Sequence, residues 1–175
     1  GDKFNIEDTD PVFTEEDFRN WFKLLFYPDK FLFYIYLIRA KKKYKEEKIT
    51  DPFRILQLNC KSGSSLVDLK KIFGREVEIY GVDSTRMQVD VAKKRVKKHE
   101  TYVEIDWWDE SRLDFPTKYF DAIFSFDREP SFCFLGASVE EINRVLKQKG
   151  KLFCFSANNN ITDNLVESGF RLNKC

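Results

Sequence analysis

The residues best suited to chemistry in this chain lie where an apolar run, residues 55–58, gives way to small and polar residues ending at Gly63. Apolar residues then recur at helical spacing until Gly74 stops the pattern. This stretch predicts a buried strand, a tight turn and a helix. Because nucleotide-type cofactors bind above the carboxyl ends of parallel strands, at junctions of this kind, we expect a cofactor site here.

The elements that position this junction repeat regularly over residues 51–175, which we predict to be the main domain. Further strands are predicted at residues 77–82, 102–105, 120–126, 151–157 and 170–173, and helices after a cap at Thr85 and at residues 139–146 and 161–168. Strands that alternate with helices predict an α/β fold with a mostly parallel sheet and helices on both of its faces.

Residues 1–50 are predicted to form an N-terminal helical extension. A capping pattern at Thr14 begins one helix, and Pro28 breaks it. A second helix begins at Phe31, and its apolar side chains from there to Ile38 occupy every face before a lysine run begins. Such a helix is either buried within the chain or in contact with another chain. The lysine run is predicted to be a solvated helix end.

Composition narrows the classes of protein. The formal net charge is +1, so no overall field favours nucleic acid or membranes, although nucleic acid is not excluded as a partner. The longest apolar run is far shorter than the roughly 18 to 20 residues of a membrane span. The four cysteines lack Cys-x-x-Cys spacing and the chain has a single histidine, so we expect no metal site and reduced thiols. We therefore expect an intracellular, cytoplasmic protein.

The order of four motifs resembles the class I S-adenosylmethionine-dependent methyltransferases, which have a Rossmann-like sheet. The first motif is I-L-Q-L-N-C-K-S-G, set against the family pattern hydrophobic-hydrophobic-acid-hydrophobic-Gly-x-Gly-x-Gly. Gly63 matches the third glycine, whereas Gln57, Asn59 and Lys61 stand where the family has the acid and two glycines. The resemblance implies that all four residues line the site of S-adenosylmethionine.

These departures change the chemistry of the loop. Asn59 is a mild change because asparagine tolerates left-handed backbone. Lys61 directs a long cation toward the cationic sulfonium of the cofactor. Neutral Gln57 cannot give an ammonium group the charge-assisted hydrogen bond that an acid gives.

The second motif is Y-G-V-D-S-T, in which Asp83 corresponds to the acid that binds both ribose hydroxyls of the cofactor. Two acceptor oxygens suit two vicinal donors. The alternative is an acid at the N-terminus of the next helix, but Thr85 already fills that cap.

The third motif, W-W-D-E-S-R-L-D-F-P, resembles the family stretch acid-x-x-x-Leu-Pro-Phe, whose acid meets the adenine amino group. Asp109 takes that place, with Asp106 as a competing candidate. Trp107 or Trp108 either stacks on adenine or packs in the core, and Trp108 is our candidate for the cofactor site.

The fourth motif, E-I-N-R-V-L-K-Q-K-G-K-L, resembles the helix and turn before the fifth strand and is structural. Before it, residues 125–132 correspond to the region where acceptor and methyl group meet. The resemblance assigns Ser125 to the cofactor site and makes Asp127 and Glu129 candidate catalytic residues that orient or deprotonate the acceptor. The alternative is that both acids are solvent-exposed loop charges.

Two functions follow from the resemblance. The first is a methyltransferase that acts on an unidentified acceptor. The alternative is a non-catalytic methyltransferase-like subunit with a structural or regulatory role in a larger complex. We expect the last edge of the sheet to be incomplete, because the family's seventh strand would lie beyond residue 173. That open edge and the apolar helix from Phe31 to Ile38 are the expected contacts for a protein partner.

Overall fold

The computed structural model describes residues 28–127 and 136–154. The chain divides into two compact units, Gly1–Asp51 and Pro52–Cys175, which are described separately below. Several predicted features lie outside the described residues: the helix that begins at Thr14, the residue Glu129, the helix at 161–168 and the strand at 170–173.

The described part of the first unit is a single helix, α2, Pro28–Glu46. The helix begins at Pro28, before the predicted start at Phe31. Proline is well accepted in a first helical turn, where its missing N–H has no partner to lose. No side chain from Phe33 to Ile38 is exposed, and Phe33, Tyr34 and Leu37 are at most 2% exposed. The lysine run at the end of α2 is largely exposed, as predicted. No helix within the described ranges is long and apolar enough to cross a membrane.

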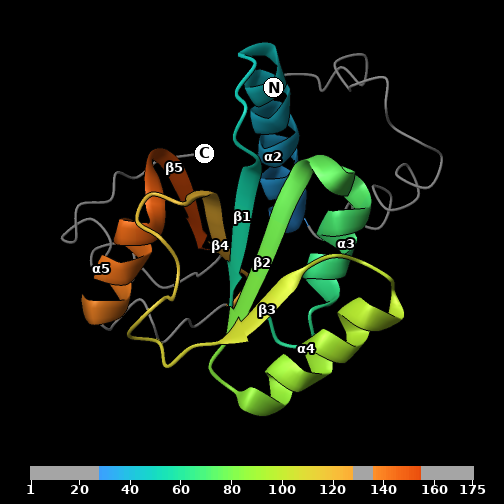
Figure 1. The fold of residues 1–175 in the computed structure, drawn as a ribbon, viewed down its shortest axis with the longest axis vertical. Coiled ribbons are helices and arrows are strands. Elements are labelled where there is room, and N and C mark those ends of the chain that lie inside the picture. The colour runs from blue at the N-terminus through green and yellow to red at the C-terminus, as the bar shows by residue number, and fades with distance from the viewer. Residues whose placement is uncertain (1–27, 128–135, 155–175) are drawn as a thin grey trace. The chain divides into compact units, whose positions relative to one another are not determined.

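The second unit is built on an open sheet of five parallel strands in the order β3-β2-β1-β4-β5 (Figure 1). The strands are β1 Phe53–Leu58, β2 Val77–Asp83, β3 Glu104–Trp107, β4 Phe120–Ser125 and β5 Leu146–Cys154. The helices are α3 Ser64–Phe73, the short 3-10 helix η2 Gly74–Glu76, α4 Arg86–Lys98 and α5 Gly136–Val145. This arrangement confirms the predicted α/β fold. The strand order reverses between β1 and β4, and ligands of such sheets bind beside that reversal.

Helices cover both faces of this sheet, with α3 and α4 on one face and α5 on the other (Figure 1). On the α5 face, Leu56 and Leu58 of β1 share one buried core with Ile142 of α5. On the opposite face, Gly81 of β2 lets α3 approach closely, because a β-carbon there would clash with the Leu66 side chain. Both layers therefore fix the carboxyl end of β1.

Several predicted boundaries differ from the structure, and the helix predicted at 139–146 is α5, Gly136–Val145. β3 lies two residues later than expected, so Tyr102 is 87% exposed and Trp107 belongs to the strand. β4 ends at Ser125, one residue early. β5 begins at Leu146, before the predicted residue 151, because Leu146 pairs with Phe120. A register shift then takes up the next residues before regular pairing resumes.

Candidate functional site

The loop after β1 keeps the backbone of a glycine-rich turn although it has a single glycine. Asn59, Lys61 and Gly63 have φ angles of 53°, 51° and 76°, so all three positions are left-handed. For lysine this conformation costs roughly 1–2 kcal/mol relative to right-handed backbone, whereas asparagine tolerates it better. The residues at the two predicted glycine positions, Asn59 and Lys61, therefore adopt a backbone conformation that favours glycine.

Main-chain hydrogen bonds tie this loop to the end of β2. The Cys60 N–H donates to the Val82 carbonyl at 3.0 Å, and the Gly63 N–H donates to the Cys60 carbonyl at 2.9 Å. Cys60 itself is buried, and burial, together with the nearby charge of Asp83, raises the pKa of its thiol to about 12. The thiol is therefore protonated at neutral pH and has no role as a nucleophile.

Asp83 joins the loop to the beginning of α4. One carboxylate oxygen accepts the Lys61 N–H at 2.8 Å, and the other accepts the Thr85 N–H at 2.9 Å. Thr85 is the N-cap residue of α4 but makes no side-chain capping bond. Thr85 thus stands at the predicted cap position, but its side chain accepts no capping hydrogen bond, and the Asp83 carboxylate accepts the N–H of Thr85 itself. Each carboxylate oxygen keeps a further lone pair for another donor.

The side chains of Asn59 and Lys61 both meet Asp127, just beyond the end of β4. The Asn59 amide donates to one carboxylate oxygen at 3.0 Å, and the Lys61 ammonium lies 2.9 Å from the other. The side-chain oxygen of Asn59 in turn accepts the indole N–H of Trp108 at 3.2 Å. The Asp127 N–H donates to the Ser125 hydroxyl at 3.2 Å, so five predicted site residues form one network.

Gln57 stands at the predicted acid position and is only 4% exposed. Its side-chain oxygen is buried and has no hydrogen-bond partner among the described residues. A buried acceptor without a donor costs about 1–3 kcal/mol. This position therefore suits a ligand that brings its own donor.

The two adjacent tryptophans have different surroundings. Trp108 is 2% exposed and packs in the core shared with α5. Its main-chain N–H donates to the Asp83 carbonyl at 3.1 Å. Trp107 is 37% exposed, and its indole N–H donates to the Ser84 carbonyl at 2.8 Å. The Arg86 guanidinium lies 4.2 Å from the Trp107 ring centre. Part of the Trp107 ring is therefore exposed to solvent. Trp108 is buried and supports the loop through its hydrogen bond to Asn59.

Asp109 lies in an exposed turn after β3. One of its carboxylate oxygens accepts the Ser111 hydroxyl at 2.7 Å, the Ser111 N–H at 2.9 Å and the Arg112 N–H at 3.1 Å. These bonds, the one from the Ser111 hydroxyl first, lower the pKa of Asp109. In the described part of the chain, no hydrogen bond connects Asp109 with Asp83 or Asp127. The competing candidate Asp106 accepts the Trp107 N–H at 2.8 Å.

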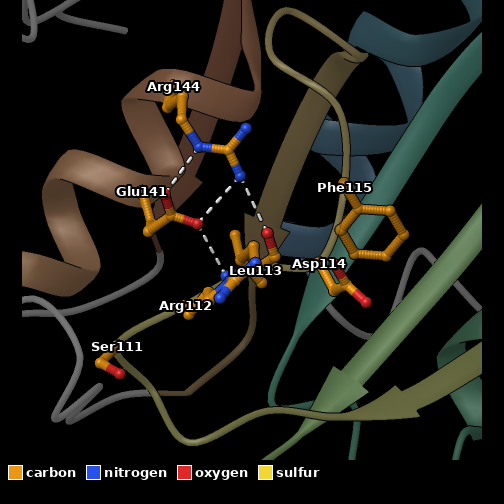
Figure 2. A pocket seen from close by; sticks show the side chains of 7 residues that line it. All are labelled: Ser111, Arg112, Leu113, Asp114, Phe115, Glu141 and Arg144. Atoms are coloured by element: carbon orange, nitrogen blue, oxygen red, sulfur yellow. Dashed lines mark hydrogen bonds and ion pairs between the residues drawn. The ribbon is translucent and has the colours of Figure 1, made fainter.

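A pocket of about 460 Å³ lies between this turn and α5 (Figure 2). Glu141 accepts the Leu113 N–H at 2.8 Å, and Arg144 donates to the Leu113 carbonyl at 2.9 Å and to Glu141 at 2.6 Å. Residues of the fourth motif, Glu141 and Arg144, therefore hold Leu113 of the third motif by hydrogen bonds. The sequence did not predict this contact. None of the predicted cofactor residues lines this pocket, so we place the candidate site at the ends of β1, β2 and β4 instead.

Comparison with known proteins identifies the family of this chain. The family model described as "Methyltransferase domain" matches residues 55–150, more than half of the chain. The chain belongs to this methyltransferase domain family, as the order of its motifs suggested.

The individual likenesses are more distant. Demethylmenaquinone methyltransferase of Staphylococcus saprophyticus is 26% identical over 117 residues, which are 65% of this chain and 48% of that protein. The chain thus spans about half the length of this curated relative. A SAM-dependent methyltransferase from Aquifex aeolicus has a TM-score of 0.61 at 22% identity, covering 77% of this chain and 80% of that one.

A third likeness is to phosphoethanolamine N-methyltransferase 2 of Haemonchus contortus in complex with S-adenosyl-L-methionine. Its TM-score is 0.57 at 21% identity, covering 70% of this chain and 34% of that one. At these identities the two solved structures speak for the fold.

Proposed function

We propose that this chain is an S-adenosylmethionine-dependent methyltransferase domain. The observation that carries the proposal is the left-handed backbone at Asn59, Lys61 and Gly63, joined through the Lys61 N–H to Asp83. Strained backbone clusters at ligand sites, and this turn has a left-handed lysine at the end of a central strand. Family membership and the S-adenosyl-L-methionine complex of a structural relative support the same cofactor.

The residues present fit the parts of that cofactor. The unpartnered oxygen of Gln57 accepts a hydrogen bond from the ammonium group of its amino-acid part. The remaining lone pairs of Asp83 accept from the ribose hydroxyls. Gly63 lets the loop pack closely against Ala92 of α4, which fixes the loop beside the site. Asp109 or the exposed part of the Trp107 ring contacts the adenine. Bound S-adenosylmethionine supplies a methyl group on a cationic sulfur.

The roles of the remaining candidates follow from their contacts. Ser125 orients the Asp127 main chain, and Trp108 supports Asn59, so both act behind the surface that meets the cofactor. Asp127 contacts the Asn59 amide and the Lys61 ammonium through its two oxygens, so its contacts favour a role in holding the loop. Transfer from an activated donor depends mainly on positioning, so the chain needs no strong base for it. Family membership favours this function over the non-catalytic alternative.

Titration calorimetry of the full chain with S-adenosylmethionine tests this proposal. We expect binding by the wild type, and a loss of affinity of about 10- to 100-fold in Asp83→Asn, because charge-assisted bonds to the ribose become neutral ones. Asp90→Asn, the same change on the exposed surface of α4, is the matched control. Melting curves of both variants check that the fold is intact.

Two results would contradict the proposal. Absence of binding by the wild type at millimolar ligand would exclude a cofactor-dependent function. An equal affinity of Asp83→Asn and the wild type would exclude the ribose role of Asp83 while leaving the cofactor in place.

A further inference from the structure

Asp127 has an unusual position relative to the altered loop. It lies beyond the end of β4, its side chain is 17% exposed, and each carboxylate oxygen meets one of the two residues that replace glycines. Asn59 and Lys61 are the two residues of this loop that have a β-carbon and a positive φ. The strained positions and the positions bound to Asp127 are therefore the same two.

The physical setting makes these contacts stronger than an ordinary surface pair. An exposed ion pair contributes little, because water screens it and two long side chains lose freedom. Here the carboxylate is mostly buried and both oxygens are occupied, and Asn59 is held from its other side by the indole of the buried Trp108. Networks in which every member is satisfied act cooperatively and hold one arrangement.

Asp127 also neutralises the charge of Lys61. Its side chain is 68% exposed, yet its ammonium lies 2.9 Å from Asp127 rather than extending freely from the loop. A cation in a loop that binds a cationic sulfur would repel it over several ångströms, and a neighbouring carboxylate cancels most of that field.

We propose that Asp127 is a positioning residue that replaces the two missing glycines. It holds Asn59 and Lys61 in the left-handed backbone by bonds to their side chains, and it neutralises Lys61 so that the loop accepts a sulfonium. The second half of this inference rests on the proposed function; the first half concerns the folded chain alone.

The first half is tested without ligand, by a thermodynamic cycle on the full chain. Asp127→Asn is compared in the wild type and in the double variant Asn59→Gly with Lys61→Gly. We expect Asp127→Asn to lower the unfolding midpoint clearly in the wild type and hardly at all in the glycine background, because glycine needs no support there. An equal shift in both backgrounds would overturn the positioning role.

Asp121→Asn is the matched control for this cycle. Asp121 is an aspartate of β4 that is 11% exposed and ion-paired to Lys147 at 3.0 Å, with no bond to the loop. Its substitution should lower the midpoint equally in the two backgrounds. If Asp121→Asn showed the same dependence on background as Asp127→Asn, the coupling would be general and the inference would fail.

The second half is tested by comparing S-adenosylmethionine with S-adenosylhomocysteine, whose sulfur is neutral. Asp127→Asn leaves the Lys61 ammonium without its counter-charge, so we expect affinity for the sulfonium to fall about tenfold more than affinity for the thioether, equivalent to about 1.4 kcal/mol. Adding Lys61→Met should restore the wild-type ratio of the two affinities.

A purely structural Asp127 would weaken both ligands alike and leave that ratio unchanged, which would overturn the charge role. If the wild type bound neither ligand, the proposed function and the charge role would fail together. The unfolding cycle would still decide the positioning role.

Discussion

Gly63→Ala is the substitution whose cost the structure defines most closely. Gly63 is the N-cap residue of α3, has φ 76°, and faces Ala92 of α4. A β-carbon added there would lie 3.0 Å from the Ala92 β-carbon and 3.3 Å from its α-carbon. Ala92 is fully buried, so both atoms belong to a rigid part of α4.

Two free-energy costs contribute to the destabilisation by Gly63→Ala. Left-handed backbone costs an alanine roughly 1–2 kcal/mol, and forcing a methyl group into a packed interior costs about 1–3 kcal/mol more. We therefore expect Gly63→Ala to lower the free energy of unfolding by about 2–5 kcal/mol, a large fraction of the stability of a typical domain.

Urea unfolding of the full chain, followed by far-ultraviolet circular dichroism, measures this loss. Repeating it in an Ala92→Gly background separates the two terms, because the closest contact is then absent and about 1–2 kcal/mol should remain. An equal cost of Gly63→Ala in both backgrounds would show that α4 does not press on the loop, and would refute the packing argument.

Two further predictions concern ionisable groups. Hydrogen bonding by Arg144 lowers the pKa of Glu141 below its ordinary value of 4.5, so the stability that this pair contributes is present above that value and is lost as the pH falls through the lowered pKa. Unfolding midpoints should show Glu141→Gln about 1–2 kcal/mol less stable at pH 7 and converging with the wild type in acid; a constant gap would contradict this. Because burial, and then the charge of Asp83, raise the pKa of the Cys60 thiol to about 12, iodoacetamide at pH 8 should modify Cys60 far more slowly than the half-buried Cys154, as read by peptide mass spectrometry. Equal rates for the two thiols in the folded chain would show that Cys60 is accessible.

Much of the fold could be predicted because buried parallel strands appear as short apolar runs. The central strands β1 and β2 lay close to their expected positions for this reason. β3 was misplaced because, of its four residues, only Ile105 is buried, which leaves no pattern to follow. The start of β5 at Leu146 could not be predicted either, since it depends on pairing with a distant residue of β4.

Part of the candidate site could likewise be predicted from the sequence, and part could not. The positions of Gln57 and Asp83 followed from local motifs. The left-handed backbone of Lys61 could not be predicted, because a lysine gives no local sign of it. Its ion-pair partner Asp127 is distant in sequence and becomes a neighbour only through the pairing of β1 with β4.

The distance in sequence between loop and anchor also affects how the domain forms during synthesis. Asn59 and Asp127 are 68 residues apart, and ribosomes add roughly 5–20 residues per second, so the anchor is made about 3–14 s after the loop. A nascent chain that has produced β1, α3 and β2 has neither β4 nor the carboxylate. The loop can therefore make its main-chain bonds to β2 first. Its side-chain contacts with Asp127 form only after β4 has paired with β1.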